Sequence, residues 1–198
     1  MVYELTYFNI PGRAEAIKLI AEVGGVPYTF KPVSFQEWPQ LKQQTKYGQL
    51  PFLKSSDNPD FELCQSIAIA RFVAREGNLY PSSNIDASFS DEYVNTIKDL
   101  NDAYFKAFFS PNKDEDLKKY YEGPFVQILK ALEKEVKPSG YLVGDSLTWA
   151  DLFLFDLLSG IGKGQDLTAY PKLAALKETV AKNPKVAQYY ESDRNLRK

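Results

Sequence analysis

The polar and apolar positions near the N-terminus change from the period of a strand to that of a helix. Over residues 3–7, large apolar side chains alternate with polar ones, as in a half-buried strand. Turn-forming residues occupy 9–12, and apolar side chains recur at helical spacing over 14–21. This predicts a strand, a sharp turn and a helix, with Tyr7 ending the strand and Arg13 starting the helix. Ligands collect at that edge of open α/β sheets, although this stretch alone favours a core tyrosine and a surface arginine.

Short elements continue up to residue 77. Three runs have the composition of short strands, at residues 28–30, 51–53 and 61–63. A weak helix is predicted over 36–44 and a stronger one from Ser66 to Gly77. We expect one small α/β layer in which the later strands pair with the first, because they have no other apolar partner.

Beyond residue 90 the pattern predicts helices only. Apolar stripes at helical spacing run over residues 94–108, 121–136 and 173–180. Gly123–Pro124 should kink the second stripe, and Asn183–Pro184 should end the third. The segment 152–159 is apolar nearly all round, so we expect it to form the buried centre of this half.

Thr148 and Asp151 have the spacing of a capping box, with Asp in place of the usual Glu. Thr148 would accept a hydrogen bond from the amide at the third helical position, while the Asp151 carboxylate reaches back to the cap. This pair predicts a helix that begins directly after Thr148.

The composition changes between the two halves, where Pro, Ser and Asn are frequent. A chain of 198 residues is long enough for one large or two small domains. We therefore predict an α/β domain over 1–78, a linker over 79–89 and an all-helical domain over 90–198.

Composition and charge exclude several classes of protein. The net charge is only −2, so we expect neither nucleic acid nor a membrane as a partner. We recognise no secretory signal or membrane-length apolar run, and the single cysteine allows no internal disulfide. A cytoplasmic location is the simplest expectation.

The chain contains no histidine. Histidine-based acid–base catalysis and nearly all zinc-enzyme ligand sets are therefore excluded. Any chemistry must use tyrosine, serine, lysine, arginine, carboxylates, or the reactive group of a bound molecule.

Four motifs together resemble the cytosolic glutathione transferases, and the sigma class in particular. They are Thr6–Asn9 with Gly12–Glu15, Gln49–Pro51, Gln65–Arg71 and Thr148–Asp151. The resemblance implies a thioredoxin-like N-terminal domain followed by an all-helical domain that holds an electrophile pocket. It also implies an enzyme that conjugates glutathione, its co-substrate, to hydrophobic electrophiles in detoxification, and that acts as a homodimer.

The resemblance makes Tyr7 the donor of a hydrogen bond to the glutathione sulfur. A free thiol titrates near ~8.5, and lowering its pKa by about two units needs roughly 2.7 kcal/mol. One hydrogen bond to a charged acceptor supplies about 1.5–3 kcal/mol, so a single tyrosine is nearly sufficient. Arg13 would add positive potential.

The rest of the implied glutathione site comes from the same resemblance. Its residues are Tyr7, Phe8, Arg13, Trp38, Lys42, Gln49, Leu50, Pro51, Gln65, Ser66 and Asp102. Leu50–Pro51 would be a cis peptide that presents the Leu50 backbone to glutathione as an added strand. Gln65 and Ser66 would bind the γ-glutamyl carboxylate at a helix start, although Ser66 also fits an ordinary N-cap.

Trp38 and Lys42 match the positions that hold the glycyl carboxylate. Without the resemblance they would be a packed tryptophan and a solvated face. Asp102 lies on the polar side of its stripe, where solvent exposure is the default expectation. The resemblance instead makes it reach across the dimer to the partner's γ-glutamyl amine.

The chain also departs from the family pattern. Lys98 and Asn101 interrupt the acidic cluster that binds a divalent cation in some sigma-class relatives, so we expect no metal. Cys64 lies away from the first strand–helix turn, where cysteine-using relatives carry theirs, and is expected to be a small packed residue.

Two alternatives remain open. The chain could be a non-catalytic carrier or crystallin-like structural protein of the same fold, or a glutathione-dependent prostaglandin isomerase. The second substrate is not readable from the sequence, because aromatic residues at helical spacing are more often core than pocket. The residues concerned are Tyr104, Phe105, Phe108 and Phe109.

Overall fold

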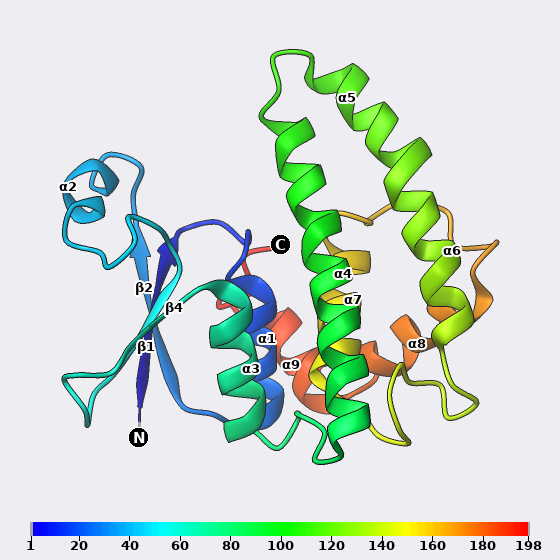
Figure 1. Cartoon of the computed structure of the whole chain (residues 1–198), viewed down its shortest axis with the longest axis horizontal. Coiled ribbons are helices and arrows are strands. Elements are labelled where there is room, and N and C mark those ends of the chain that lie inside the picture. Colours follow the sequence, from blue (N-terminus) through cyan, green and yellow to red (C-terminus); the bar gives the residue numbers. More distant parts are fainter. Residues whose placement is uncertain (1, 198) are drawn as a thin grey trace. The chain divides into compact units, whose positions relative to one another are not determined.

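The computed structural model describes residues 2–197, which form two compact units. One unit comprises the chain up to Tyr80 together with the segment from Asn183 onward, and the other comprises Pro81–Lys182. The first contains a four-stranded sheet and the second is helical (Figure 1). The predicted combination of an α/β and an all-α part is confirmed.

The sheet of the first unit has the order β2-β1-β3-β4. Its strands are β1 (Tyr3–Phe8), β2 (Tyr28–Val33), β3 (Phe52–Ser55) and β4 (Glu62–Cys64). β1 is parallel to β2 and antiparallel to β3, with Leu5 opposite Phe30 on one side and Leu53 on the other. The expectation that all later strands pair with β1 was wrong for β4, which pairs only with β3. A short turn joins these two strands as a hairpin, so β4 finds its partner locally.

Three helices belong to the N-terminal part of this unit: α1 (Glu15–Gly24), α2 (Trp38–Lys42) and α3 (Ser66–Glu76). α1 and α3 lie side by side (Figure 1). A Cβ atom at Gly24 would lie 2.8 Å from the Cα of Gly77, so the close approach at the helix ends requires glycine.

The C-terminal segment packs with the first unit. The predicted helical domain runs over 90–198, whereas α9 (Pro184–Glu191) and the described residues after it join the unit that contains α1. The chain leaves the helical unit at Asn183–Pro184, where proline ends α8 as predicted. Buried polar groups on α1 receive their partners from this segment, as described below.

The helical unit contains five α-helices and one turn of π-helix among its described residues. They are α4 (Asn84–Phe108), α5 (Lys113–Tyr120), the π turn η1 (Tyr121–Phe125), α6 (Val126–Glu135), α7 (Trp149–Ser159) and α8 (Pro171–Ala181). The predicted linker over 79–89 overlaps α4, because Ser83 caps this helix by accepting from the Asp86 amide at 3.4 Å. The predicted irregularity at Gly123–Pro124 is the π turn.

α7 is buried along its whole length except at its last residue, as the sequence predicts. The capping box at its start is present. Asp151 Oδ2 accepts from the Thr148 amide at 2.8 Å, and Asp151 Oδ1 accepts from the Leu142 amide at 2.8 Å. Burial nevertheless raises the pKa of Asp151 to about 6, against the lowering effect of these hydrogen bonds.

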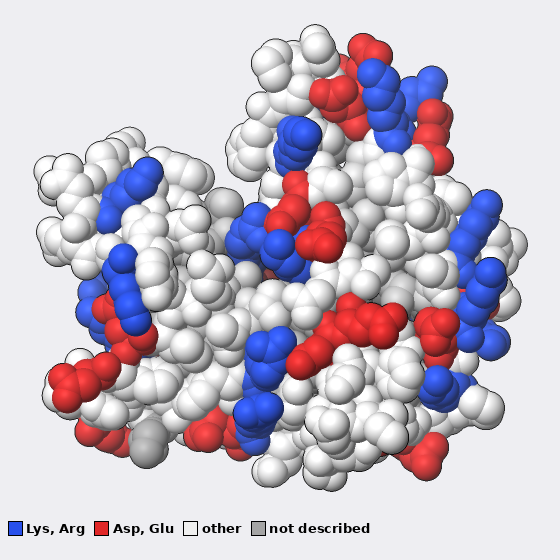
Figure 2. All heavy atoms as spheres, in the orientation of Figure 1, with Lys and Arg blue, Asp and Glu red and all other residues white. Residues whose placement is uncertain are grey.

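Charged side chains of both signs are interspersed on each unit, on the face that Figure 2 shows. Across residues 2–197, no helix has both the length and the hydrophobicity that crossing a bilayer requires. The same residues contain no group of three or more Cys, Asp or Glu side chains placed to hold a metal ion.

Candidate functional site

Tyr7 is the last residue but one of β1, which ends at Phe8, and it is held by the turn that follows the strand. Its side chain is only 6% exposed, and the backbone N–H of Arg13 donates to its hydroxyl oxygen at 3.1 Å. Gly12 has a φ of +43°, and a Cβ atom there would lie 2.6 Å from the Tyr7 hydroxyl. The turn therefore presses against the phenol, and glycine is the residue that permits this approach.

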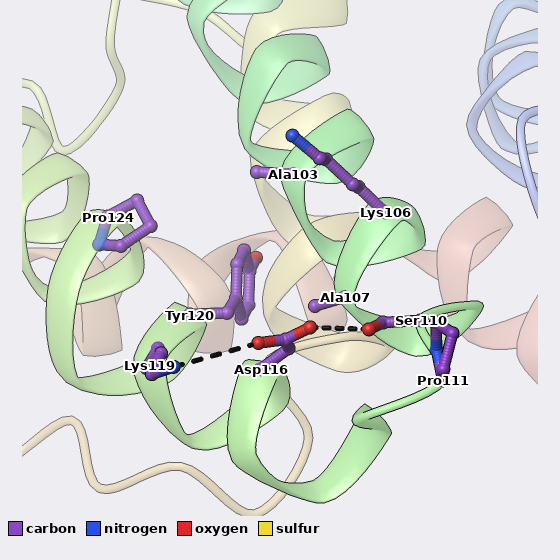
Figure 3. A pocket seen from close by; sticks show the side chains of 9 residues that line it. All are labelled: Ala103, Lys106, Ala107, Ser110, Pro111, Asp116, Lys119, Tyr120 and Pro124. Carbon is purple, nitrogen blue, oxygen red and sulfur yellow. Dashed lines mark hydrogen bonds and ion pairs between the residues drawn. The ribbon is translucent and has the colours of Figure 1, made fainter.

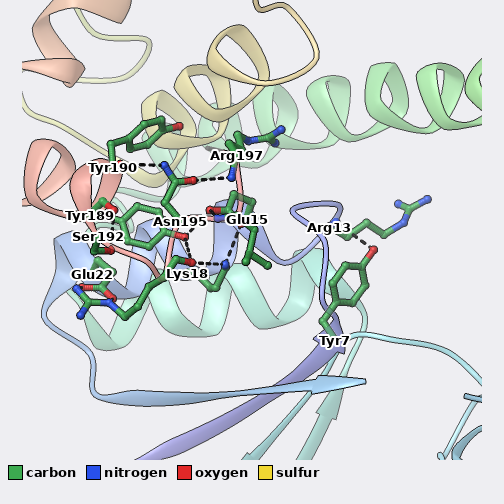
Figure 4. A network of polar contacts seen from close by, with 12 residues as sticks. Tyr7, Arg13, Glu15, Lys18, Glu22, Tyr189, Tyr190, Ser192, Asn195 and Arg197 are labelled. Carbon is green, nitrogen blue, oxygen red and sulfur yellow. Dashed lines mark hydrogen bonds and ion pairs between the residues drawn. The ribbon is translucent and has the colours of Figure 1, made fainter. Parts of the chain in front are cut away.

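The electrostatics keep the Tyr7 hydroxyl protonated at neutral pH. Burial raises the pKa of Tyr7 above its ordinary value of ~10, and the Arg13 hydrogen bond and charge lower it by less. Because the oxygen accepts from Arg13, the phenolic proton can be donated to a ligand. Figure 4 shows that the link between the two residues runs to the Arg13 backbone.

A second group of predicted residues meets where β3 and α3 begin. The peptide bond between Leu50 and Pro51 is cis, as predicted. Gln65 Nε2 donates to Gln49 Oε1 at 3.3 Å, which brings the two glutamines together. Ser66 is the first residue of α3, so the expectation of a Ser66 N-cap was wrong and Gln65 occupies that place.

Gln65 adopts a φ of +74°, which is uncommon for a residue other than glycine. Its side chain makes no capping hydrogen bond to α3. The first amides of α3 are therefore not capped by Gln65 and remain suited to an anion. Strained backbone at such a place is a recurrent feature of ligand sites.

The residues on α2 form a third group. Trp38 packs edge-on against Phe8, with ring centroids 5.6 Å apart, and Phe8 stacks on Phe35 at 4.8 Å. The Lys42 side chain lies 3.4 Å from the position of a Cβ at Gly48, just before Gln49. Phe35 was not among the residues predicted for the site. Its position three residues before Trp38 could have indicated that the two aromatic side chains lie on the same side of the chain.

Asp102 belongs to the helical unit. Lys98 pairs with it at 2.7 Å on the same helix, and both side chains are about one-third exposed. The Asp102 side chain is thus less exposed than expected for a residue on the polar side of its helix. Its predicted action across a dimer stays a prediction.

The helical unit contains a cavity of about 510 Å³ between α4 and the α5–η1 region (Figure 3). Its walls are mainly apolar and include Ala103, Ala107, Pro124 and the buried Tyr120. Ser110 Oγ donates to Asp116 at 2.5 Å on the polar side. None of the four aromatic residues singled out from the sequence lines this cavity.

Those four residues instead belong to an aromatic cluster at the end of α4, which adjoins the cavity through Tyr120. Tyr104 stacks on Phe108 at 5.7 Å and also contacts the rings of Tyr120 and Tyr121. Phe109 is 74% exposed. The cluster is therefore partly core and partly surface.

Comparison with known families gives two matches that together cover most of the chain. Residues 3–75 match the model of the glutathione S-transferase N-terminal domain, and residues 98–193 match that of the C-terminal domain. The second match ends within the segment that the structure packs on the first unit.

Individual relatives agree with these matches. A "Probable glutathione S-transferase 5" of Caenorhabditis elegans is 35% identical, with 96% of each chain covered. "S-crystallin SL11" of Nototodarus sloanii is 30% identical, covering 98% of this chain and 97% of its own. A solved structure of a glutathione S-transferase from Necator americanus, described as monomeric, has a TM-score of 0.88 and 30% identity, with 98% of both chains covered.

Proposed function

Because the chain belongs to the glutathione S-transferase family, we propose that Tyr7 stabilises the glutathione thiolate for conjugation to hydrophobic electrophiles. The observation that carries this proposal is the Tyr7 hydroxyl, buried, protonated and fixed by the Arg13 amide. A neutral phenol can donate to a sulfur anion, whereas a phenolate would repel it. The thiolate is the nucleophile, and its former proton leaves to solvent. With a chloronitrobenzene the sulfur forms a bond to the ring carbon, the carbon–chlorine bond breaks, and chloride leaves with the bonding electron pair.

The other two groups support binding of the tripeptide. Ser66 and the first amides of α3 suit the γ-glutamyl carboxylate, because a helix start carries partial positive charge. The backbone of Leu50 would pair with the cysteinyl part of glutathione as an added strand. Trp38 and Lys42 would hold the glycyl end, with Lys42 supplying the charge.

The decisive experiment compares Tyr7→Phe with Tyr3→Phe, a variant on the same strand whose hydroxyl donates to Glu76 at 3.0 Å. Tyr7→Phe should retain glutathione affinity, lower turnover at least tenfold, and raise the pH at which bound thiolate absorbs in the ultraviolet by about one unit or more. Tyr3→Phe should leave the thiolate titration at its parent position. An unchanged titration in Tyr7→Phe would remove Tyr7 from this role.

A crystallin-like structural role is the second candidate, and the 30% identity to an S-crystallin favours keeping it in view. One set of residues, present together, favours the enzyme: Tyr7, Arg13, Trp38, Lys42, Gln65 and Ser66. Retention on glutathione resin together with conjugation of a chloronitrobenzene would support the enzyme. Failure in both assays by the folded protein would favour the structural role.

We further propose a sigma-class-like, cytoplasmic homodimer in which Asp102 completes the partner's glutathione site. The solved relative described as monomeric makes association worth measuring directly. Sedimentation at low micromolar concentration should give a dimer, and Asp102→Ala should raise the KM for glutathione. A monomer with full conjugating activity would defeat the shared site.

For the electrophile we propose the helical unit, whose cavity of about 510 Å³ is large enough for a small aromatic molecule. Ala107→Trp would fill this cavity, and Phe108→Ala would alter the aromatic cluster. The variant that raises the KM for the electrophile without changing that for glutathione identifies the pocket. A panel that adds prostaglandin H and lipid-peroxidation aldehydes would test isomerase and peroxidase-linked roles.

A further inference from the structure

The first turn of α1 contains two buried charges that the proposed reaction does not use. Glu15 and Lys18 each expose only 1% of their side chains and form an ion pair of 2.9 Å. The Lys18 ammonium also lies 4.9 Å from the centre of the Phe30 ring. A buried ion pair is weak evidence for stability, because desolvation offsets its attraction, but it can specify one arrangement of the chain.

The C-terminal segment surrounds both charges (Figure 4). Tyr189 Oη donates to Glu15 Oε1 at 2.5 Å, and the Leu196 amide donates to the same oxygen at 3.3 Å. Lys18 Nζ donates to the Arg194 carbonyl at 2.7 Å. The segment 189–196 is thus hydrogen-bonded to the first turn of α1, which begins 174 positions before Tyr189.

The other end of α1 has its own, separate attachments. Arg194 Nε pairs with Glu22 at 2.7 Å, and Lys185 Nζ donates to the Val23 carbonyl at 2.8 Å. Tyr28 Oη donates to Glu22 Oε1 at 3.1 Å. These contacts lie at the last turn of α1, whereas Glu15 and Lys18 receive theirs at the first turn.

The backbone path from Glu15 to Tyr7 is short. The amide of Glu15 donates to the Pro11 carbonyl at 3.0 Å, which closes the turn that contains Arg13. The Arg13 amide in turn donates to Tyr7 Oη. Because Gly12 leaves no free space against the phenol, a shift of the first turn of α1 would move the Arg13 amide relative to Tyr7.

We propose that Glu15 is a positioning residue for Tyr7, and that the C-terminal segment holds it in place through Tyr189. Glu15 does not touch the thiol in this proposal, and acts by keeping the Arg13 amide on the Tyr7 hydroxyl. The inference rests on the proposed role of Tyr7 in thiolate stabilisation. It makes residues 189–196 part of the support of the site, although none of them lies near Tyr7 in the sequence.

The test uses Tyr189→Phe, which deletes one hydroxyl, and Glu15→Gln, which keeps the shape of the side chain. Tyr28→Phe is the matched control, because it removes a tyrosine–glutamate hydrogen bond at the opposite end of the same helix. Amide hydrogen exchange at Arg13 is measured in the full-length protein without ligand. Exchange at Arg13 should become at least about threefold faster in Tyr189→Phe and Glu15→Gln, and stay at the parent rate in Tyr28→Phe.

Thiolate formation is then measured with glutathione bound. The ultraviolet titration midpoint should rise by about half a unit to one unit in Tyr189→Phe, with a smaller change in the KM for glutathione than in kcat. Unchanged Arg13 exchange in two folded variants would overturn the proposal, and so would an equal acceleration in Tyr28→Phe. If the parent protein forms no thiolate, the proposed function fails, and the exchange data alone then decide whether Glu15 positions the turn.

Discussion

Two helices of this protein begin with a buried carboxylate, and they use it in opposite ways. At α7, Asp151 accepts from the amides of Thr148 and Leu142, three and nine residues away, and so caps its own helix. At α1, Glu15 pairs with the nearby Lys18 but accepts its hydrogen bonds from Tyr189 and Leu196, far along the chain. The cap at Asp151 stabilises one helix, whereas the hydrogen bonds of Glu15 join two distant segments of the chain and, in our proposal, hold the turn beside Tyr7.

Only the carboxylate of Asp151 could be recognised from the sequence, because its capping partner Thr148 lies at a fixed spacing. A capping box has fixed spacing, because the third residue of a helix always lies beside its cap. No spacing rule links residue 15 to residue 189, since their contact depends on how α9 packs on α1. The following changes separate the two kinds of carboxylate.

Removal of the cation beside Glu15 should have the largest effect on stability. Lys18→Ala leaves a buried carboxylate without its charged partner, and should lower the free energy of unfolding by about 3–5 kcal/mol in a denaturant titration. Lys31→Ala is the control, because Lys31 is exposed and pairs with Glu4 at 3.7 Å. That change should cost less than about 1 kcal/mol. Similar losses in both variants would show that the Glu15 pair acts like a surface pair.

Loss of the local cap should have the next largest effect. Asp151→Ala leaves the amides of Leu142 and Thr148 without their acceptor inside the helical unit, so we expect about 2–4 kcal/mol of destabilisation. Ser83→Ala removes a cap from the exposed start of α4 and should cost only about 1 kcal/mol. Denaturant curves for Asp151→Ala that overlay those of the parent protein would contradict the structural role of this cap.

The pH dependence of stability should show a smaller effect of the same carboxylate. The pKa of Asp151 is about 6 in the folded chain and 3.8 for an ordinary aspartate, so the folded state binds the proton more tightly. Its contribution to the free energy of unfolding is therefore largest below pH 3.8 and is lost as the pH rises to about 6. Two pKa units correspond to at most about 3 kcal/mol.

Asp151→Asn removes this titration. The difference in unfolding free energy between Asp151→Asn and the parent should change between pH 4 and 6 and be constant from pH 7 to 8. A difference that is flat across the whole range would show that the carboxylate has its ordinary pKa in the folded protein.

The motifs shared with the glutathione transferases predicted the residues of the candidate site better than the hydrophobic pattern predicted the details of the fold. The cis bond at Pro51 agrees with the motif-based prediction, and the structure brings Gln49 and Gln65, two residues of the implied site, into contact. The partner of β4, the start of α4 at Asn84 and the existence of α9 were not predicted correctly. The partner of β4 depends on closure of a hairpin, the start of α4 on a single serine cap, and α9 on a short helix that begins at a proline. In each case the local sequence signal was weak, because the surrounding residues have the composition of a loop or linker.

The sequence by itself determined what depends on neighbouring residues. The period of residues 3–7 determined the type of β1, which ends one residue later than predicted, at Phe8. The cap at Thr148 and the apolar run determined the type and the start of α7, because side-chain direction and helix capping are set within one or two turns. Only the tertiary structure decided the position of the C-terminal segment, the packing of the turn against Tyr7 and the partners of Glu15. The contacts between the C-terminal segment and Glu15 join residues that are distant in the sequence, and these meet only after the sheet and its helices have formed. The contact of the turn with Tyr7 is only six positions long, but its geometry follows no fixed spacing rule.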